Sequence, residues 1–114
     1  MIEHYATGSY MKIAGKSYHQ DLKIIGDRVK ENWWRNQGHR LDIDDIADIL
    51  SAKPEVLVIG TGYAGNLRIP ADVRTAIENH DISVVAHETA KAATIFNRLY
   101  NEGKDVAGAF HLTC

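Results

Sequence analysis

The chain has 114 residues, which is enough for one domain with one core and too short for two. With 45% hydrophobic residues, 25% charged residues and a net charge of −2, its composition is that of an ordinary globular domain. The single cysteine excludes a disulfide framework and favours a reducing compartment, so we expect a cytoplasmic protein. The longest uncharged apolar run, Val56 to Ala64, is far shorter than the roughly 20 residues of a membrane-spanning helix.

Charge is divided unevenly along the chain. Residues 1–40 contain seven Lys/Arg and four Asp/Glu, whereas residues 41–114 contain six and eleven. This mild positive bias is not the clustered basic stripe of a nucleic-acid-binding protein, so we expect no nucleic-acid partner. The N-terminus has neither a basic flank nor an apolar block, which argues against a signal or transit peptide. We also expect no membrane association.

Short β-strands are predicted in the N-terminal third. Apolar segments indicate strands at residues 10–13, 22–25 and 29–34, and Gly26-Asp27 suits a tight hairpin turn between the last two. Val29 and Trp33 fall on one face of the third segment, which is typical of a half-buried strand. Because no helix separates these strands, we expect a hairpin-rich layer or the antiparallel edge of a mixed sheet.

Helical and extended patterns alternate after residue 40. Asp42 begins a predicted helix that Pro54 ends, Pro70 opens a second helix, and Thr89 caps a third that ends at Gly103. Buried strands are predicted at residues 55–60, 82–86 and 106–112.

This order of elements predicts crossover connections. The predicted fold class is therefore α/β: one domain over residues 1–114, with a mixed, largely parallel central sheet flanked by helices and a β-hairpin-rich N-terminal layer. The direction of the last strand stays open, since it could also run antiparallel.

The segment Gly60-Thr61-Gly62-Tyr63-Ala64-Gly65 matches the pattern G-x-G-x-x-G directly after a predicted strand. In a dinucleotide site the third glycine lies inside the helix that holds the pyrophosphate, whereas here Pro70 delays the helix by about one turn. Two interpretations therefore stand, a glycine-permitted chain reversal and an anion or nucleotide cradle. We expect no resident cofactor.

One edge of the predicted sheet is the candidate place for a small ligand. If the last three strands are parallel, their C-terminal ends share an edge, where ligands of open α/β sheets bind. The candidate ligand-binding residues at this edge are Gly60, Thr61, Gly62, Gly65, His87, Thr89 and His111.

The segment from Trp33 to His39 is the candidate surface for a protein partner. Adjacent tryptophans in a strand point to opposite faces, so one can be buried while the other is exposed. An exposed Trp beside an Arg is typical of a binding hot spot, and the candidate residues are Trp34, Arg35 and His39. The alternative is that Trp34 fills the gap between the hairpin layer and the sheet.

The six histidines do not predict a metal site. No two of them are four residues apart, and there is no second thiol. His111 and Cys114 are three apart on a predicted strand, which would place them on opposite faces and argues against a zinc site or a Cys–His nucleophile pair. No serine lies in the context of a nucleophile elbow. We therefore expect no metal, and whether the chain is an enzyme stays uncertain.

Several segments resemble the Mth938-like family, a domain of unknown function. They are Trp34-Arg35, Gly38-His39, Pro54 to Gly62, Thr89, Asn97, Leu99 and the closing His111-Leu112-Thr113-Cys114. The resemblance runs from about Trp33 to Cys114, and it implies a mixed sheet flanked by helices with additional β structure. Family members similar to this chain include a mitochondrial assembly factor for respiratory complex I and an animal protein linked to fat-cell differentiation. The resemblance implies no catalytic residue.

Two functions follow as hypotheses. The first is a non-enzymatic protein-interaction or assembly-factor module with an unknown protein partner, supported by the resemblance and by Trp34-Arg35. The second is a small-ligand-binding protein or an enzyme that uses the Gly60–Gly65 turn. The oligomeric state is open, and a homodimer is one of the alternatives.

Overall fold

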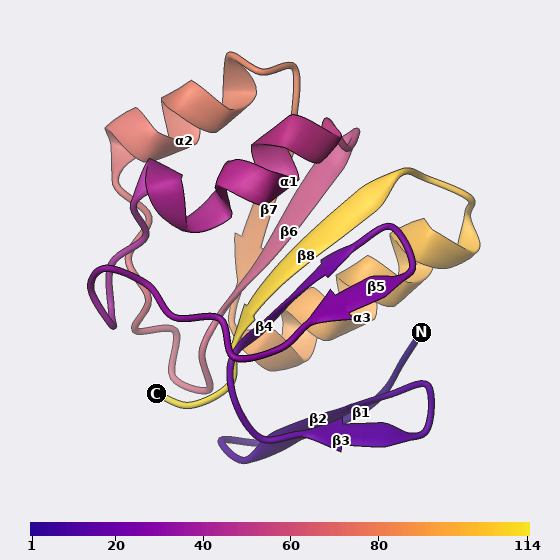
Figure 1. Cartoon of the computed structure of the whole chain (residues 1–114). Coiled ribbons are helices and arrows are strands. Elements are labelled where there is room, and N and C mark those ends of the chain that lie inside the picture. Colours follow the sequence, from indigo (N-terminus) through magenta and orange to yellow (C-terminus); the bar gives the residue numbers. More distant parts are fainter.

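A five-stranded mixed sheet forms the centre of the molecule in the computed structural model, which describes residues 1–114 (Figure 1). The strand order is β5-β4-β8-β6-β7. Its strands are β4 (Leu22–Ile25), β5 (Arg28–Lys30), β6 (Val56–Thr61), β7 (Ser83–His87) and β8 (Val106–His111). β6 is parallel to both β7 and β8, whereas β4 is antiparallel to β8 and β5 is antiparallel to β4. The predicted α/β class with a mixed central sheet is confirmed, and the last strand is parallel to its neighbour β6.

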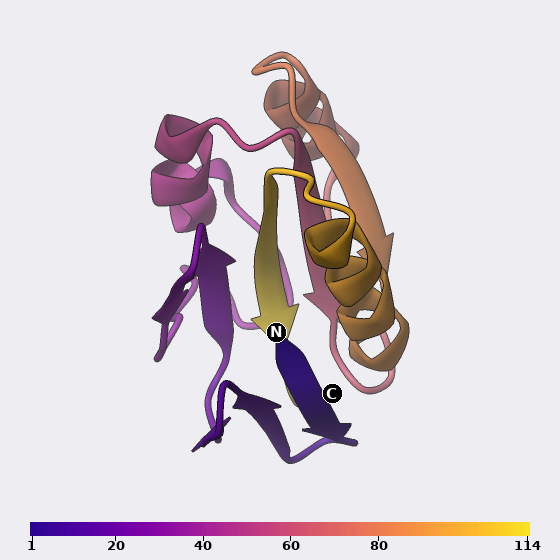
Figure 2. The same ribbon diagram turned by 90° about the vertical axis from the view of Figure 1, so that its right-hand side faces the viewer.

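Helices cover both faces of this sheet. A 3₁₀ turn, η1 (Ile43–Ile46), leads into α1 (Ala47–Ala52), while α2 (Ala71–Glu78) connects β6 to β7 and α3 (Thr89–Asn101) connects β7 to β8. Figure 2 shows α1 and α3 on opposite sides of the sheet. None of the helices has the length and apolar character needed to cross a membrane.

Two hydrophobic clusters follow from the alternation of side chains along the strands. Leu57 and Ile59 of β6 belong to one buried cluster together with side chains of α1 and α2. Val58, between them, belongs to the other cluster, in which Phe96 of α3 contacts Phe110 edge to face. The continuous apolar run of β6 is therefore explained by burial on both faces.

A separate three-stranded antiparallel sheet precedes the central one. It consists of β1 (Ile2–Ala6), β2 (Tyr10–Ile13) and β3 (Lys16–Tyr18), of which β2 alone was expected from the sequence. Buried Met11 and Ile13 join the cluster that contains α3. The Asn97 side chain of α3 binds both backbone groups of Ile2, accepting from its N–H at 2.9 Å and donating to its carbonyl at 2.6 Å. Both N-terminal alternatives are thus present, a hairpin layer in β1–β3 and an antiparallel edge in β4–β5.

The strand predicted at residues 29–34 is shorter than expected. β5 ends at Lys30, because Asn32 takes a left-handed backbone (φ 58°) and the Trp33 N–H donates to the Asp21 carbonyl at 2.8 Å. The two tryptophans still differ in solvent exposure as predicted: Trp33 is 5% exposed and Trp34 is 77% exposed. The Trp33 indole N–H donates to the carbonyl of Asp45 at 2.9 Å, which attaches this segment to η1.

Candidate functional site

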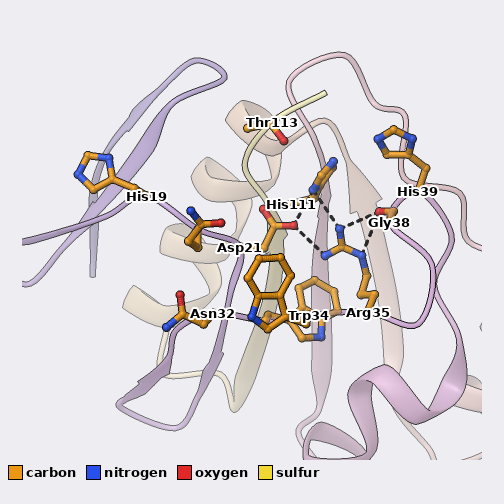
Figure 3. A pocket seen from close by; sticks show the side chains of 11 residues that line it. His19, Asp21, Asn32, Trp34, Arg35, Gly38, His39, His111 and Thr113 are labelled. Carbon is orange, nitrogen blue, oxygen red and sulfur yellow. Dashed lines mark hydrogen bonds and ion pairs between the residues drawn. The ribbon is translucent and has the colours of Figure 1, made fainter.

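A pocket of about 230 Å³ opens beside the end of β8, at the C-terminal edge of the sheet (Figure 3). Its walls come from the segment before β4, the segment after β5 and the segment after β8. The lining residues are His19, Gln20, Asp21, Asn32, Trp33, Trp34, Arg35, Gly38, His39, His111 and Thr113. Drug-sized ligands usually occupy roughly 300–1,000 Å³, so this largely polar pocket suits a side chain or a smaller group better than a nucleotide.

Asp21 lies at the centre of the pocket and joins its walls. Its carboxylate accepts from the Leu112 N–H at 2.8 Å and from His111 Nδ1 at 2.7 Å, and it pairs with Arg35 Nη1 at 2.9 Å. Burial alone would raise the pKa of Asp21, but the hydrogen bonds from His111 and Leu112 and the Arg35 guanidinium outweigh it, so the pKa lies below its usual value. Asp21 is therefore an anion at neutral pH.

The Arg35 side chain is buried and holds the neighbouring loop in place. Its side chain is 4% exposed, its Nε and Nη2 atoms donate to the Gly38 carbonyl at 3.2 and 2.8 Å, and its guanidinium lies 4.7 Å from the Trp33 ring centroid. The Nη1 contact with Asp21 is an ion pair without hydrogen-bond alignment. The partner-binding candidate Arg35 is therefore a buried neighbour of the exposed Trp34, and its guanidinium holds the loop from 35 to 38.

His111 has one nitrogen in the network and one without a partner. Nδ1 lies 2.7 Å from a carboxylate oxygen of Asp21, which can only accept, and 3.2 Å from Arg35 Nη2, which can only donate. The contact with Asp21 is the shorter one, and Nη2 already donates to Gly38, so we assign the proton to Nδ1, which donates it to Asp21. In the neutral ring this leaves a lone pair on Nε2, which is buried and has no hydrogen-bond partner. In Figure 3 this second nitrogen points away from Asp21 and Arg35. The arrangement supplies a fixed acceptor or ligand atom at the pocket wall.

The glycines of the Gly60–Gly65 turn are needed for close packing. A Cβ at Gly60 would lie 2.8 Å from both Phe110 and the Thr89 hydroxyl. At Gly62, where φ is +106°, it would lie 2.5 Å from the Thr113 carbonyl oxygen. The space above these two glycines is therefore occupied by the chain itself, which supports the chain-reversal interpretation of the motif.

Thr89 ties this turn to the end of β8. Its buried hydroxyl accepts from the Gly62 N–H at 2.9 Å and donates to the His111 carbonyl. The prediction that Thr89 caps α3 is wrong, because Glu88 holds the cap position and no side chain caps the helix. Of the seven candidate ligand residues, His111 lines the pocket. The others border the same sheet edge outside it: Gly60, Thr61, Gly62, Gly65, His87 and Thr89.

The expected separation of His111 and Cys114 is also wrong. β8 ends at His111, and the chain then turns across the glycine turn, where the Thr113 and Cys114 carbonyls accept from the N–H groups of Tyr63 and Asn66 at 3.4 and 3.2 Å. His39, His111 and Cys114 consequently lie together, with one potential ligand atom of each within 4.8 Å of the others. The geometric argument against a metal site therefore fails.

Asp21 is the main site residue that sequence reasoning missed. The other missed lining residues are His19, Gln20, Asn32, Trp33, Gly38 and Thr113. The one available signal is that Asp21 directly precedes an apolar strand. Its meaning depends on the antiparallel pairing of Leu22 with Phe110, which places Asp21 opposite the end of β8. That pairing joins residues about 90 positions apart and leaves no local pattern.

The family described as "Protein of unknown function (DUF498/DUF598)" matches residues 2–111. The chain belongs to this family. A conserved hypothetical protein from Pyrococcus horikoshii OT3 is similar to this DUF498/DUF598 chain at 26% identity and a TM-score of 0.85, covering 100% of this chain and 99% of that one.

Two further structures are similar to the DUF498/DUF598 chain. One, described as an outer membrane protein from Bartonella henselae, has 28% identity and a TM-score of 0.83, covering 99% of this chain and 94% of that one. A Mth938-like domain from Bordetella pertussis shares the fold at 22% identity and a TM-score of 0.66, covering 98% and 85%. The resemblance to the Mth938-like family is confirmed, and this family is one of unknown function.

Proposed function

We propose that this chain is a non-enzymatic protein-interaction module whose partner binds over Trp34 and the adjacent pocket. The observation that carries the proposal is the exposure of Trp34, whose side chain is 77% exposed at the rim of the pocket. Trp is the residue type most enriched in binding hot spots, which lie beside pockets that become desolvated on binding. Covering this indole would bury a large apolar surface that the free chain leaves in water.

The backbone that presents Trp34 is held on both sides. Trp33 is buried and hydrogen-bonded to Asp45, and Arg35 is fixed by Asp21 and Gly38. A partner would therefore meet a preformed surface, and little conformational entropy would be lost on binding.

The chemistry of the pocket indicates which partner fits. Beside Trp34 lie polar groups from His19, Asn32 and His39, around a space that suits one side chain. We therefore propose an extended segment of a partner protein, with an apolar side chain against Trp34 and a polar side chain in the pocket. The assembly-factor role implied by the family resemblance belongs to the same class of function.

A nucleotide site at the Gly60–Gly65 turn has less support. Gly60 and Gly62 are covered by Phe110, Thr89 and the C-terminal segment. A phosphate would have to displace these groups, whereas the pocket beside Trp34 is already open.

The test compares Trp34→Ala with Tyr63→Ala, because Tyr63 is the other large exposed aromatic side chain, at 58%. Proteins captured from a lysate of the source cells are quantified by mass spectrometry for the wild type and both variants. Affinity is then measured with the purified partner. We expect Trp34→Ala to weaken binding by about 30-fold or more, which corresponds to a hot spot of about 2 kcal/mol, and Tyr63→Ala to bind like the wild type.

Thermal unfolding of both variants serves as the folding control, and we expect both to unfold close to the wild type because both side chains are exposed. If every captured protein binds Trp34→Ala as tightly as the wild type, the proposed surface is wrong.

A further inference from the structure

Three side chains with metal-binding atoms meet where the C-terminal segment passes the pocket. His39 comes from the loop after β5, His111 ends β8, and Cys114 lies beyond the turn of the chain. The two imidazole rings lie 5.7 Å apart, edge to face, and one potential ligand atom of each residue lies within 4.8 Å of the others. The three residues span 75 positions of the chain, so no short sequence motif could have predicted that they lie together.

His111 is already arranged as a metal ligand. Asp21 accepts from its Nδ1 at 2.7 Å and so directs the lone pair to Nε2, which is buried and has no partner. The ring itself is 6% exposed, so its orientation is fixed by packing. Histidines that bind metal ions commonly donate their other N–H to a carboxylate, which fixes the ring and raises the basicity of the ligand nitrogen.

A potential ligand atom of His39 and one of Cys114 already lie within 4.8 Å of a ring nitrogen of His111. Zinc–ligand bonds of roughly 2.0–2.3 Å place tetrahedral ligand atoms about 3.3–3.7 Å apart, so the cluster has to contract by about 1 Å. His39 and Cys114 are both exposed, and rotation of their side chains supplies this movement without disturbing the core. Asp21 and Arg35 compensate each other's charge, and a Cys114 thiolate adds the negative charge that favours a divalent cation.

We propose that His39, His111 and Cys114 bind one Zn²⁺ ion, with Asp21 as a positioning residue. Two imidazoles and one thiolate are ligands that zinc prefers, whereas magnesium and calcium prefer oxygen ligands. Three protein ligands leave a fourth position for water or for a side chain of a bound protein. The proposed zinc site does not include Trp34, so it can be tested independently of the proposed function.

The test is a titration of the full chain, in the presence of a non-chelating reductant, with Co²⁺ as a spectroscopic substitute for Zn²⁺. We expect one equivalent to bind, with a thiolate-to-cobalt charge-transfer band in the near ultraviolet, and Zn²⁺ to displace it. Cys114→Ser should lose that band, and His39→Ala should weaken binding by at least about tenfold. His80→Ala removes an exposed histidine of the segment after α2 and should bind like the wild type.

Asp21→Asn tests the positioning role. Removal of the carboxylate partner of a metal-binding histidine typically lowers affinity by 10–100-fold, and we expect a loss in this range with the charge-transfer band retained. The proposal is overturned if the folded wild type binds no Co²⁺, if binding shows no thiolate band, or if Cys114→Ser and His39→Ala bind as tightly as the wild type. Trp34→Ala should bind Co²⁺ like the wild type. A negative result in the cobalt titration would therefore overturn the zinc site without deciding whether Trp34 binds a partner.

Discussion

At the scale of single residues, the site depends on Asp21. One carboxylate holds the backbone of Leu112, the ring of His111 and the guanidinium of Arg35. These groups come from the loop after β5 and from the last residues of the chain. Its negative charge is stabilised in the folded protein more than in the unfolded chain, which is why its pKa is lowered although burial opposes this.

Asp21→Asn should therefore reduce stability in a pH-dependent way. At pH 7 we expect a loss of about 2–3 kcal/mol in the free energy of unfolding, since hydrogen bonds to a buried charge and an ion pair are removed. In the unfolded wild type Asp21 is protonated as the pH falls through about 4, whereas in the folded state it stays ionised to lower pH. The difference in the free energy of unfolding between the wild type and Asp21→Asn should thus be largest above about pH 5 and shrink below pH 4. Urea unfolding at several pH values from 3 to 7 measures this difference.

Asp44→Asn is the matched control, because Asp44 is exposed. It should change stability by no more than about 0.5 kcal/mol at every pH. An Asp21→Asn loss that stays constant down to pH 3 would mean that the carboxylate charge is not what stabilises the network.

The opposite environments of Trp33 and Trp34 agree with the prediction, but the reason differs from the predicted one. Both residues lie beyond the end of β5, and Trp33 is held inward by its hydrogen bonds to the carbonyls of Asp21 and Asp45. The burial of Arg35 could not be predicted from local periodicity, because it requires a carboxylate 14 positions earlier in the chain.

At the scale of elements, the Gly60–Gly65 turn acts as a support for the site. Gly62 lies under the C-terminal segment, and Thr89 connects it to the carbonyl of His111. The turn thereby holds His111 and Cys114 beside the loop that carries His39. The sequence left two interpretations of this turn open, a chain reversal and an anion or nucleotide cradle, and the packing over Gly60 and Gly62 supports the chain reversal.

Gly62→Ala and Gly65→Ala separate packing from backbone strain. Both glycines have positive φ, +106° and +76°, so both substitutions strain the backbone by about 1–2 kcal/mol. A Cβ at Gly65 would lie 3.7 Å from Thr61, an ordinary contact, whereas at Gly62 it would overlap the Thr113 carbonyl at 2.5 Å. We expect Gly62→Ala to lose about 3 kcal/mol or more in thermal or urea unfolding, and Gly65→Ala clearly less. Equal losses would show that the C-terminal segment does not press on Gly62.

At the scale of the whole molecule, the pairing of β4 with β8 creates the site. It inserts the N-terminal third beside the last strand, so that the segments 19–21, 32–39 and 111–114 meet at one end of the sheet (Figures 1 and 3). The alternating helices and strands after residue 40 were predictable from their 3.6- and 2-residue periods. β1 and β3 were not, because Ile2 to Ala6 and Lys16 to Tyr18 carry mostly exposed or half-buried residues without a clear apolar face.

The measurement that tests the partner surface most directly is photo-crosslinking in the source cells. A photoreactive residue replaces Gln20, which is exposed and lines the pocket beside Trp34, and a control chain carries it at the exposed position of Arg98 on α3. We predict one defined protein adduct from position 20, absent from position 98 and strongly reduced when Trp34→Ala is added to the position-20 chain. An adduct that forms equally from both positions, or that persists undiminished with Trp34→Ala, would contradict the proposed interaction surface.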